Sequence, residues 1–159
     1  MVPRVYWRHA LLSVKINLLF GREELSAVEA QVRAEALAQG FDAKTAASLV
    51  YVVEEIGANV LVHSGAHWLE VRFQATDNGA VLCFLDDGEE FDPIEAAQLM
   101  DAPVISEFVT GHLGLWTLKR LPFKQTWRRN GNVNELSFSV IRAGHNASDG
   151  RSDSSLNFN

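Results

Sequence analysis

Asp77-Asn78-Gly79-Ala80-Val81-Leu82-Cys83-Phe84-Leu85-Asp86 is the stretch that decides the fold. Its first three residues form a strong hairpin-turn signal. The run that follows is apolar until its end, which is typical of a central strand. Residues 67–75 alternate between polar and apolar side chains and predict the strand that precedes the turn. The stretch therefore predicts an antiparallel hairpin in the middle of a sheet.

The segments before and after this hairpin in the sequence predict helices and further strands. Residues 13–20 alternate and predict a strand that Gly21 ends, while 23–38 have the apolar spacing of a helix. Asp42 is a good N-cap for a second helix to His63, and Pro93 can open a short helix to Met100. After a loop at 101–110, we expect a helix at 113–121 and a hairpin of strands 123–128 and 133–140 around 129–132. This order predicts an α+β fold, a two-layer α/β sandwich with a mostly antiparallel sheet and helices on one face.

Length and composition bound the class of protein. The chain has 159 residues, 47% hydrophobic and 21% charged, with a net charge of −6. These values predict one globular domain over residues 1–142, with a Ser-, Asn- and Asp-rich disordered tail at 143–159. The acidic balance argues against direct nucleic-acid binding. Because no apolar stretch approaches the roughly 18 residues of a membrane span, we expect no membrane partner and a cytoplasmic location.

The helix at 42–63 offers the first set of candidate functional residues. Glu55 and Asn59 are one helical turn apart, and His63 follows at the same spacing, beside the apolar stripe of the helix. A carboxylate there could accept a proton, and an amide oxygen could join phosphate oxygens around a magnesium ion. The spacing alone is equally typical of a solvated helix face, and His63 also suits the dipole at the helix end.

The second set follows the apolar strand, where Asp86-Asp87-Gly88-Glu89-Glu90-Phe91-Asp92-Pro93 begins. A carboxylate at this strand end can accept a hydrogen bond from an exocyclic amine such as that of adenine. Gly88 allows the backbone to approach a flat base closely. An ordinary Asp-Gly turn is the alternative for this segment alone.

The third set is Gly111-His112-Leu113-Gly114-Leu115, where a glycine-containing loop opens a helix. Amide groups at a helix N-terminus bind phosphate, and glycines permit close approach. The alternative is that the glycines serve only the turn geometry. The preceding loop is the natural lid over a bound nucleotide.

The three segments together resemble the N box and the two glycine boxes of the GHKL ATPase superfamily. Glu55, Asn59 and His63 are similar to its Glu-x-x-x-Asn box, and the segment from Asp86 to Pro93 is similar to its Asp-x-Gly-x-x-Phe-Asp-Pro box. Gly111 to Leu115 resembles Gly-x-Leu-Gly-Leu. The short chain and the Phe-Asp-Pro ending look most like the anti-sigma-factor serine kinases of the RsbW and SpoIIAB type.

This resemblance implies a Bergerat-type ATP site. Glu55 would be the general base, Asn59 the Mg²⁺ ligand, and Asp86 the adenine contact. The other nucleotide-binding residues would be Gly88, Gly111, His112, Leu113, Gly114 and, in the last strand, Asn134. Such kinases phosphorylate a serine of a STAS-domain anti-anti-sigma partner, hold a sigma factor or other regulator, and are usually homodimers.

The sequence departs from the resembling kinases in two places, which keeps other functions open. His112 stands where glycine is common, and residues 94–110 contain no Lys or Arg, although phosphoryl transfer relies on cations. One alternative is a catalytically weak protein-binding module that switches its grip on a regulator with the nucleotide. Another is a histidine-kinase-like ATPase domain that acts in trans on a separate chain.

Overall fold

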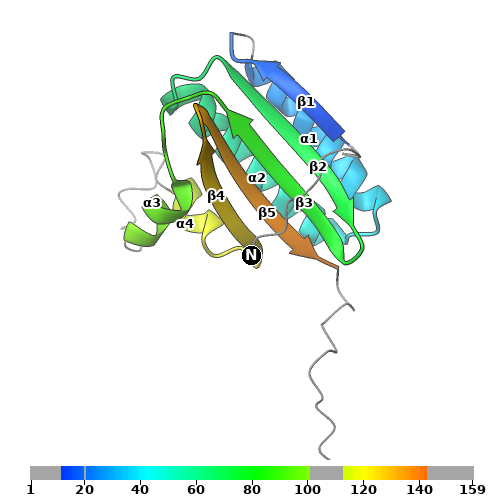
Figure 1. The fold of residues 1–159 in the computed structure, drawn as a ribbon. Coiled ribbons are helices and arrows are strands. Elements are labelled where there is room, and N and C mark those ends of the chain that lie inside the picture. Colours follow the sequence, from blue (N-terminus) through cyan, green and yellow to red (C-terminus); the bar gives the residue numbers. More distant parts are fainter. Residues whose placement is uncertain (1–11, 20, 101–112, 143–159) are drawn as a thin grey trace, which may run out of the picture.

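A computed structural model describes residues 12–19, 21–100 and 113–142, which form a sheet with helices packed on one face (Figure 1). In chain order the elements are β1 (Leu12–Asn17), α1 (Gly21–Ala38), α2 (Ala43–His63), β2 (Trp68–Thr76), β3 (Gly79–Asp86), α3 (Pro93–Leu99), α4 (Leu113–Leu118), β4 (Lys124–Asn130) and β5 (Val133–Ile141). The five strands run in the order β1-β2-β3-β5-β4, and every neighbouring pair is antiparallel. The predicted α+β sandwich is confirmed.

Strand β3 is the centre of the sheet, as its apolar sequence predicts. The hairpin turn pairs Thr76 with Gly79, and Leu69 lies opposite Asp86 at the far end. On its other side β3 pairs with β5, so that Asp86 lies opposite Asn134. The sheet therefore brings two polar side chains that are far apart in sequence to one end of its two middle strands.

The core lies between the sheet and the pair of long helices, α1 and α2. Inward side chains of the middle strands, such as Phe73, Phe84 and Phe138, are almost completely buried, as are Leu49 and Val53 of α2. Helix α2 is long and apolar enough to cross a membrane, with a mean hydropathy of 1.4 over its most apolar window. Its packing against the sheet and α1 is that of a core helix.

Local signals in the sequence locate the ends of several helices. The Asp42 side chain accepts a hydrogen bond from the Thr45 amide at 2.7 Å and caps α2 as predicted. Asp92 caps α3 by accepting from the amides of Ile94 and Glu95, and Pro93 occupies the first turn. These caps anchor α3 directly after the loop that leaves β3.

The observed boundaries differ from the predicted ones in three places. Gly21 begins α1 instead of ending the first strand, and α4 ends at Leu118 instead of 121. Strand β4 continues to Asn130, so the last turn is shorter than the predicted 129–132 and Arg129 belongs to the strand. Propensity alone does not place these ends, because pairing with β5 extends β4 through two arginines. The predicted loop at 101–110 and the tail at 143–159 lie outside the described residues.

Candidate functional site

A cavity of about 640 Å³ opens beside the carboxyl end of β3, between α2, α3 and the strands β4 and β5. Its walls carry mainly apolar side chains, with a smaller group of polar ones. The lining residues are Ile56, Asn59, Val60, His63, Ser64, Phe84, Asp86, Glu89, Glu90, Phe91, Pro93, Ala96, Met100, Leu115, Trp127, Asn134 and Leu136. A mostly apolar cavity of this size with a few convergent polar groups is typical of a small-molecule site.

Asp86 is the buried acid of this cavity, with 7% of its surface exposed. Its Oδ1 accepts hydrogen bonds from the Gly88 amide at 2.9 Å and from Asn134 Nδ2 at 3.0 Å. Among the described residues, none donates a hydrogen bond to the second oxygen, Oδ2. Oδ2 can therefore still accept a hydrogen bond, and a donor group of a ligand could supply it.

The neighbouring acid, Asp87, has a different environment from Asp86. Its carboxylate accepts from the backbone amides of His67 and Trp68 at 2.8 and 3.1 Å and contacts the His67 ring. Burial of Asp87 opposes ionisation, but these hydrogen bonds outweigh it and lower the pKa of the carboxyl. Asp87 therefore fixes the backbone at the start of β2. Of the two acids, only Asp86 lines the cavity.

Gly88 lies where the chain leaves β3 beside Asp86. A Cβ at this position would lie 2.7 Å from Ser64 Cβ and 2.9 Å from Asp86 Oδ1. Any larger residue would therefore displace the carboxylate or the end of α2. The glycine therefore permits the close approach of the chain after β3 to the end of α2.

Helix α2 presents Asn59 and His63 to the cavity, one turn apart. The described residues include no hydrogen-bond partner for the Asn59 side chain, which is half-buried. His63 is exposed at the helix end. The predicted amide is therefore placed in the cavity wall and is available to a ligand.

Glu55 does not line the cavity, although it belongs to the same face of α2. Its carboxylate lies against the first turn of α4, where a Cβ added at Gly114 would come within 2.8 Å of Glu55 Cδ and closer still to Oε2. The structure thus brings Glu55 and Gly114 together from two segments that the sequence separates widely. Only a glycine leaves room for the carboxylate there.

Burial is the main influence on the ionisation of Glu55. It raises the pKa of the carboxyl, a hydrogen bond with Tyr51 opposes the rise, and the nearby Glu54 adds to it. The raised pKa makes the carboxylate a better proton acceptor than an exposed glutamate. Glu55 therefore differs from an ordinary helix-surface acid both in its solvent exposure and in its affinity for a proton.

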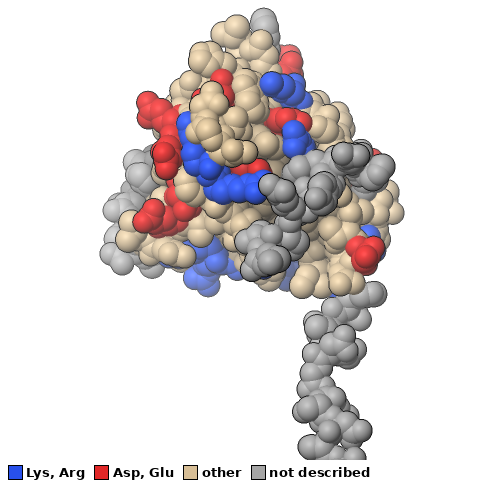
Figure 2. All heavy atoms as spheres, in the orientation of Figure 1, with Lys and Arg blue, Asp and Glu red and all other residues tan. Residues whose placement is uncertain are grey.

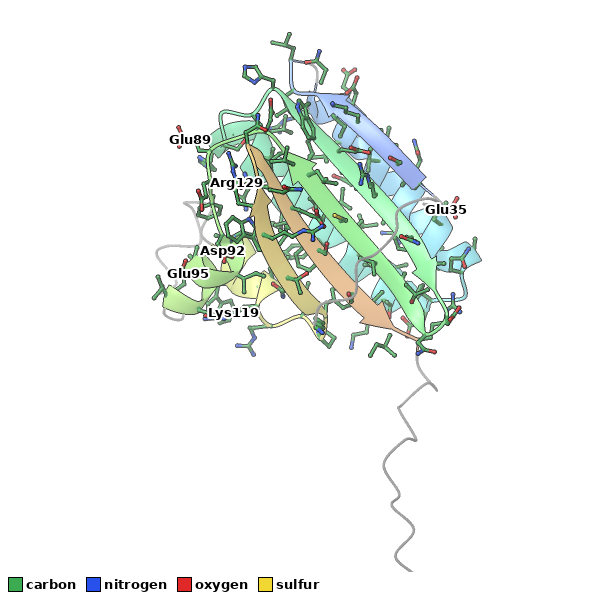
Figure 3. The ribbon with its side chains drawn as sticks, in the orientation of Figure 1. Glu35, Glu89, Asp92, Glu95, Lys119 and Arg129 are labelled. Carbon is green, nitrogen blue, oxygen red and sulfur yellow. The ribbon has the colours of Figure 1, made fainter. Side chains whose placement is uncertain are left out.

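Charged side chains are unevenly distributed over the face of the molecule that Figure 2 shows. Figure 2 shows Asp and Glu side chains gathered along one edge, with Lys and Arg beside them over β4 and β5. Figure 3 labels two cations that were not among the predicted site residues, Lys119 directly after α4 and Arg129 on β4. Lys119 donates to the carbonyls of Ala97 and Met100 at 3.2 and 3.0 Å and holds the end of α3. Arg129 donates to Asn134 Oδ1 and to the Gly88 carbonyl.

Two of the predicted phosphate-loop residues, Gly111 and His112, lie outside the described residues, and Leu113 is described only as the first residue of α4. No cluster of three or more His, Cys, Asp or Glu residues that could hold a metal occurs in the described part of the chain. A divalent ion near Asn59 would therefore need most of its ligands from phosphate oxygens and water, which is the usual pattern for Mg²⁺.

Comparison with known families gives one match. The family model of the histidine kinase-like ATPase domain matches residues 22–140, which is most of the chain. The matched range runs from the start of α1 to the end of β5 and includes Asn59, Asp86, Gly88 and Asn134. A search of curated proteins finds no match.

Proposed function

Because the chain belongs to the histidine kinase-like ATPase family, whose domain binds ATP, we propose that it is a regulatory protein kinase that transfers the γ-phosphoryl group of ATP to a serine of a partner protein. The observation that carries the proposal is the buried carboxylate of Asp86 in the wall of the cavity. Its Oδ1 is saturated, and its Oδ2 has no donor among the described residues.

The cavity fits the base of a nucleotide. A volume of about 640 Å³ lies within the usual range for small-molecule sites, and the walls near Asp86 include Phe84, Trp127 and Leu136. The exocyclic amine of adenine would donate to Asp86 Oδ2 while the flat ring lies along the apolar walls. Gly88 would let the backbone approach the ring edge, which a side chain would prevent.

The phosphate end would lie along α2 toward α4. Asn59, which has no side-chain hydrogen-bond partner among the described residues, would hold Mg²⁺ together with the phosphates, and the ion would offset negative charge on the transferred group. Gly111, His112, Leu113 and Gly114 would shape the loop that carries the phosphates.

Glu55 would act as the general base for the attacking serine. It lies one turn from Asn59 and against Gly114, so it borders both segments of the phosphate end. Its raised pKa increases its capacity to take the hydroxyl proton.

The proposed partners follow from the resemblance of the three motifs to the anti-sigma-factor kinases. The serine would belong to a STAS-domain anti-anti-sigma protein, and the unphosphorylated partner would compete with a sigma factor or another regulator for this chain. The active form would be a cytoplasmic homodimer. The residues considered for its interface, around Tyr6, Trp7 and Leu11, lie outside the described residues.

Isothermal titration with ATP, with and without Mg²⁺, tests the nucleotide site. Wild type is expected to bind more tightly with Mg²⁺, and Asn59→Ala should lose that difference. Asn132→Ala, in the exposed turn before β5, is the matched control and should behave as wild type. Failure of wild type to bind ATP at all would refute the proposal.

Incubation with γ-labelled ATP and STAS-domain proteins of the same organism tests the transfer. Acid-stable label on a serine is expected, and Glu55→Gln should reduce its rate by about 10²–10⁴, the range of general-base contributions. Equal rates for wild type and Glu55→Gln would remove the assigned base. Acid-labile label on a histidine would favour the trans-acting ATPase domain of a histidine-kinase system.

A catalytically weak binding module is the second candidate, and two observations favour it. Residues 94–110 contain no Lys or Arg, and Glu55 is outside the cavity wall. In that case ATP would bind and alter the affinity for a regulator without label appearing on any protein. The same labelling experiment distinguishes it from the kinase.

A further inference from the structure

Arg129 donates three hydrogen bonds beside the cavity. Its Nη1 donates to Asn134 Oδ1 at 2.9 Å and to the Gly88 carbonyl at 2.8 Å, and its Nε donates to the Gly131 carbonyl at 3.2 Å. Register places Arg129 directly opposite Asn134. Figure 3 labels it on β4, beside the loop that carries Glu89. One side chain thus ties β4, β5 and the loop after β3 together.

The guanidinium decides which way the Asn134 amide points. Arginine offers only donors, so only the oxygen end of the amide can face it. The NH₂ end then faces the other way, where it donates to Asp86 Oδ1 at 3.0 Å and to the Glu89 carbonyl at 2.8 Å. A flipped amide would set NH₂ against the guanidinium and oxygen against the carboxylate, losing all three bonds.

The orientation of Asn134 in turn determines what Asp86 can accept. With Asn134 Nδ2 and the Gly88 amide both on Oδ1, that oxygen has no remaining acceptor site of good geometry. The carboxylate is held in one plane and keeps Oδ2 as its one open acceptor among the described residues. Such a carboxylate suits a single amine donor of a ligand.

We propose that Arg129 is a positioning residue for the base end of the site: by fixing the Asn134 amide, it aims Asp86 Oδ2 at the exocyclic amine of the bound base. The role rests on the proposed nucleotide site. Arg129 itself does not line the cavity, so it acts through Asn134 and the Gly88 carbonyl. Its neighbour Arg128 points to the other face of β4, pairs with Glu135 at 2.7 Å, and is the matched control.

The test compares two nucleotides, ADP and purine riboside 5′-diphosphate, which lacks the exocyclic amine. Calorimetric Kd values are measured for wild type, Arg129→Met, Arg129→Lys and Arg128→Met. We expect wild type to prefer ADP by about tenfold or more, the size of one hydrogen bond to a charged group. Arg129→Met should lose most of that preference while its Kd for the analogue stays within about twofold. Arg129→Lys should retain part of the preference, and Arg128→Met all of it.

A second measurement needs no nucleotide: hydrogen exchange of the Asn134 side-chain NH₂ by NMR, which should be slow in wild type and at least about tenfold faster in Arg129→Met. Equal weakening of both nucleotides, or an unchanged exchange rate, overturns the positioning role and leaves the nucleotide site standing. If wild type binds neither nucleotide, the proposed function fails as well, even where the exchange result shows that Arg129 orients the amide. Should Arg129→Met not fold, Arg129→Lys carries both comparisons, because lysine lacks the guanidinium fork that makes both Nη1 hydrogen bonds. Full retention of the ADP preference and of slow exchange in Arg129→Lys would then refute the role.

Discussion

Gly114→Ala should separate catalysis from folding, because its added methyl group meets the flexible end of Glu55. The Cβ would lie 2.8 Å from Glu55 Cδ, where an ordinary contact begins at 3.4 Å. The carboxyl carbon must therefore move by at least about 0.6 Å, and the nearer oxygen by more. A misplacement of about 1 Å at a reacting group can cost roughly 10²-fold in rate.

The expected cost in stability is small by comparison. Replacing glycine by alanine inside a helix contributes up to about 1 kcal/mol of stability, while rearranging the carboxylate costs a similar amount. We therefore expect the free energy of unfolding to change by less than about 1 kcal/mol. ATP turnover should fall by about 10²-fold at saturating ATP.

The assay pairs urea unfolding with steady-state ATP turnover for Gly114→Ala, Glu55→Asp and the double variant. Aspartate is shorter by one methylene, so Gly114→Ala should cost less in the Glu55→Asp background than in wild type. Glu54→Asp, on the exposed neighbour, is the control. Additive losses in the double variant, or wild-type turnover in Gly114→Ala, would refute the reasoning.

Three further predictions concern the fold and the ionisation of Glu55. Leu49→Ala in α2, at 0% exposure, should lower the free energy of unfolding by about 2–5 kcal/mol in urea, and Leu99→Ala, at 81% exposure, should change it by less than about 0.5 kcal/mol. Asp92→Ala removes the cap of α3 and should cost about 0.5–2 kcal/mol, measured the same way, with Asp92→Asn recovering most of it. Since burial raises the pKa of Glu55, the folded state binds its proton more tightly than the unfolded state does, and this contribution to stability is lost as pH rises from about 4.5 through the folded pKa. As pH rises through that window, the unfolding free energy of wild type should therefore fall relative to that of Glu55→Gln. Parallel curves of unfolding free energy against pH would contradict the raised pKa.

Much of the architecture could be predicted from local sequence. The apolar run of β3 and the turn before it identified the central hairpin, and alternation or helical spacing identified most other elements. Asp42 also marked the start of α2, and between the two helices Gly40 has a φ of +82°. These predictions worked because caps, turns and amphipathic periods depend on residues within one or two turns of the chain.

The site could be predicted in part. The structure places Asn59, Asp86 and Asn134 around one cavity, as the motifs led us to expect. It also shows that Asp86 lines the cavity and Asp87 does not, a difference that the residue types alone do not reveal. Glu55 lies one turn from Asn59 but is not among the residues that line the cavity, and its carboxylate rests against Gly114. Arg129 was missed because it was assigned to a turn; alternation extended to the end of β4 would have placed it on the inner face with Trp127.

The sequence by itself determined the order of the elements, the central strand, the helix caps and the residue types that can bind a nucleotide. Tertiary structure alone decided that Arg129 meets Asn134, that Asn134 meets Asp86 across the β3–β5 pair, and that the Glu55 carboxylate rests on Gly114. The physical reason is range. Propensities and periodicities act over a few residues, whereas these contacts join segments that only strand register and helix packing bring within hydrogen-bonding distance.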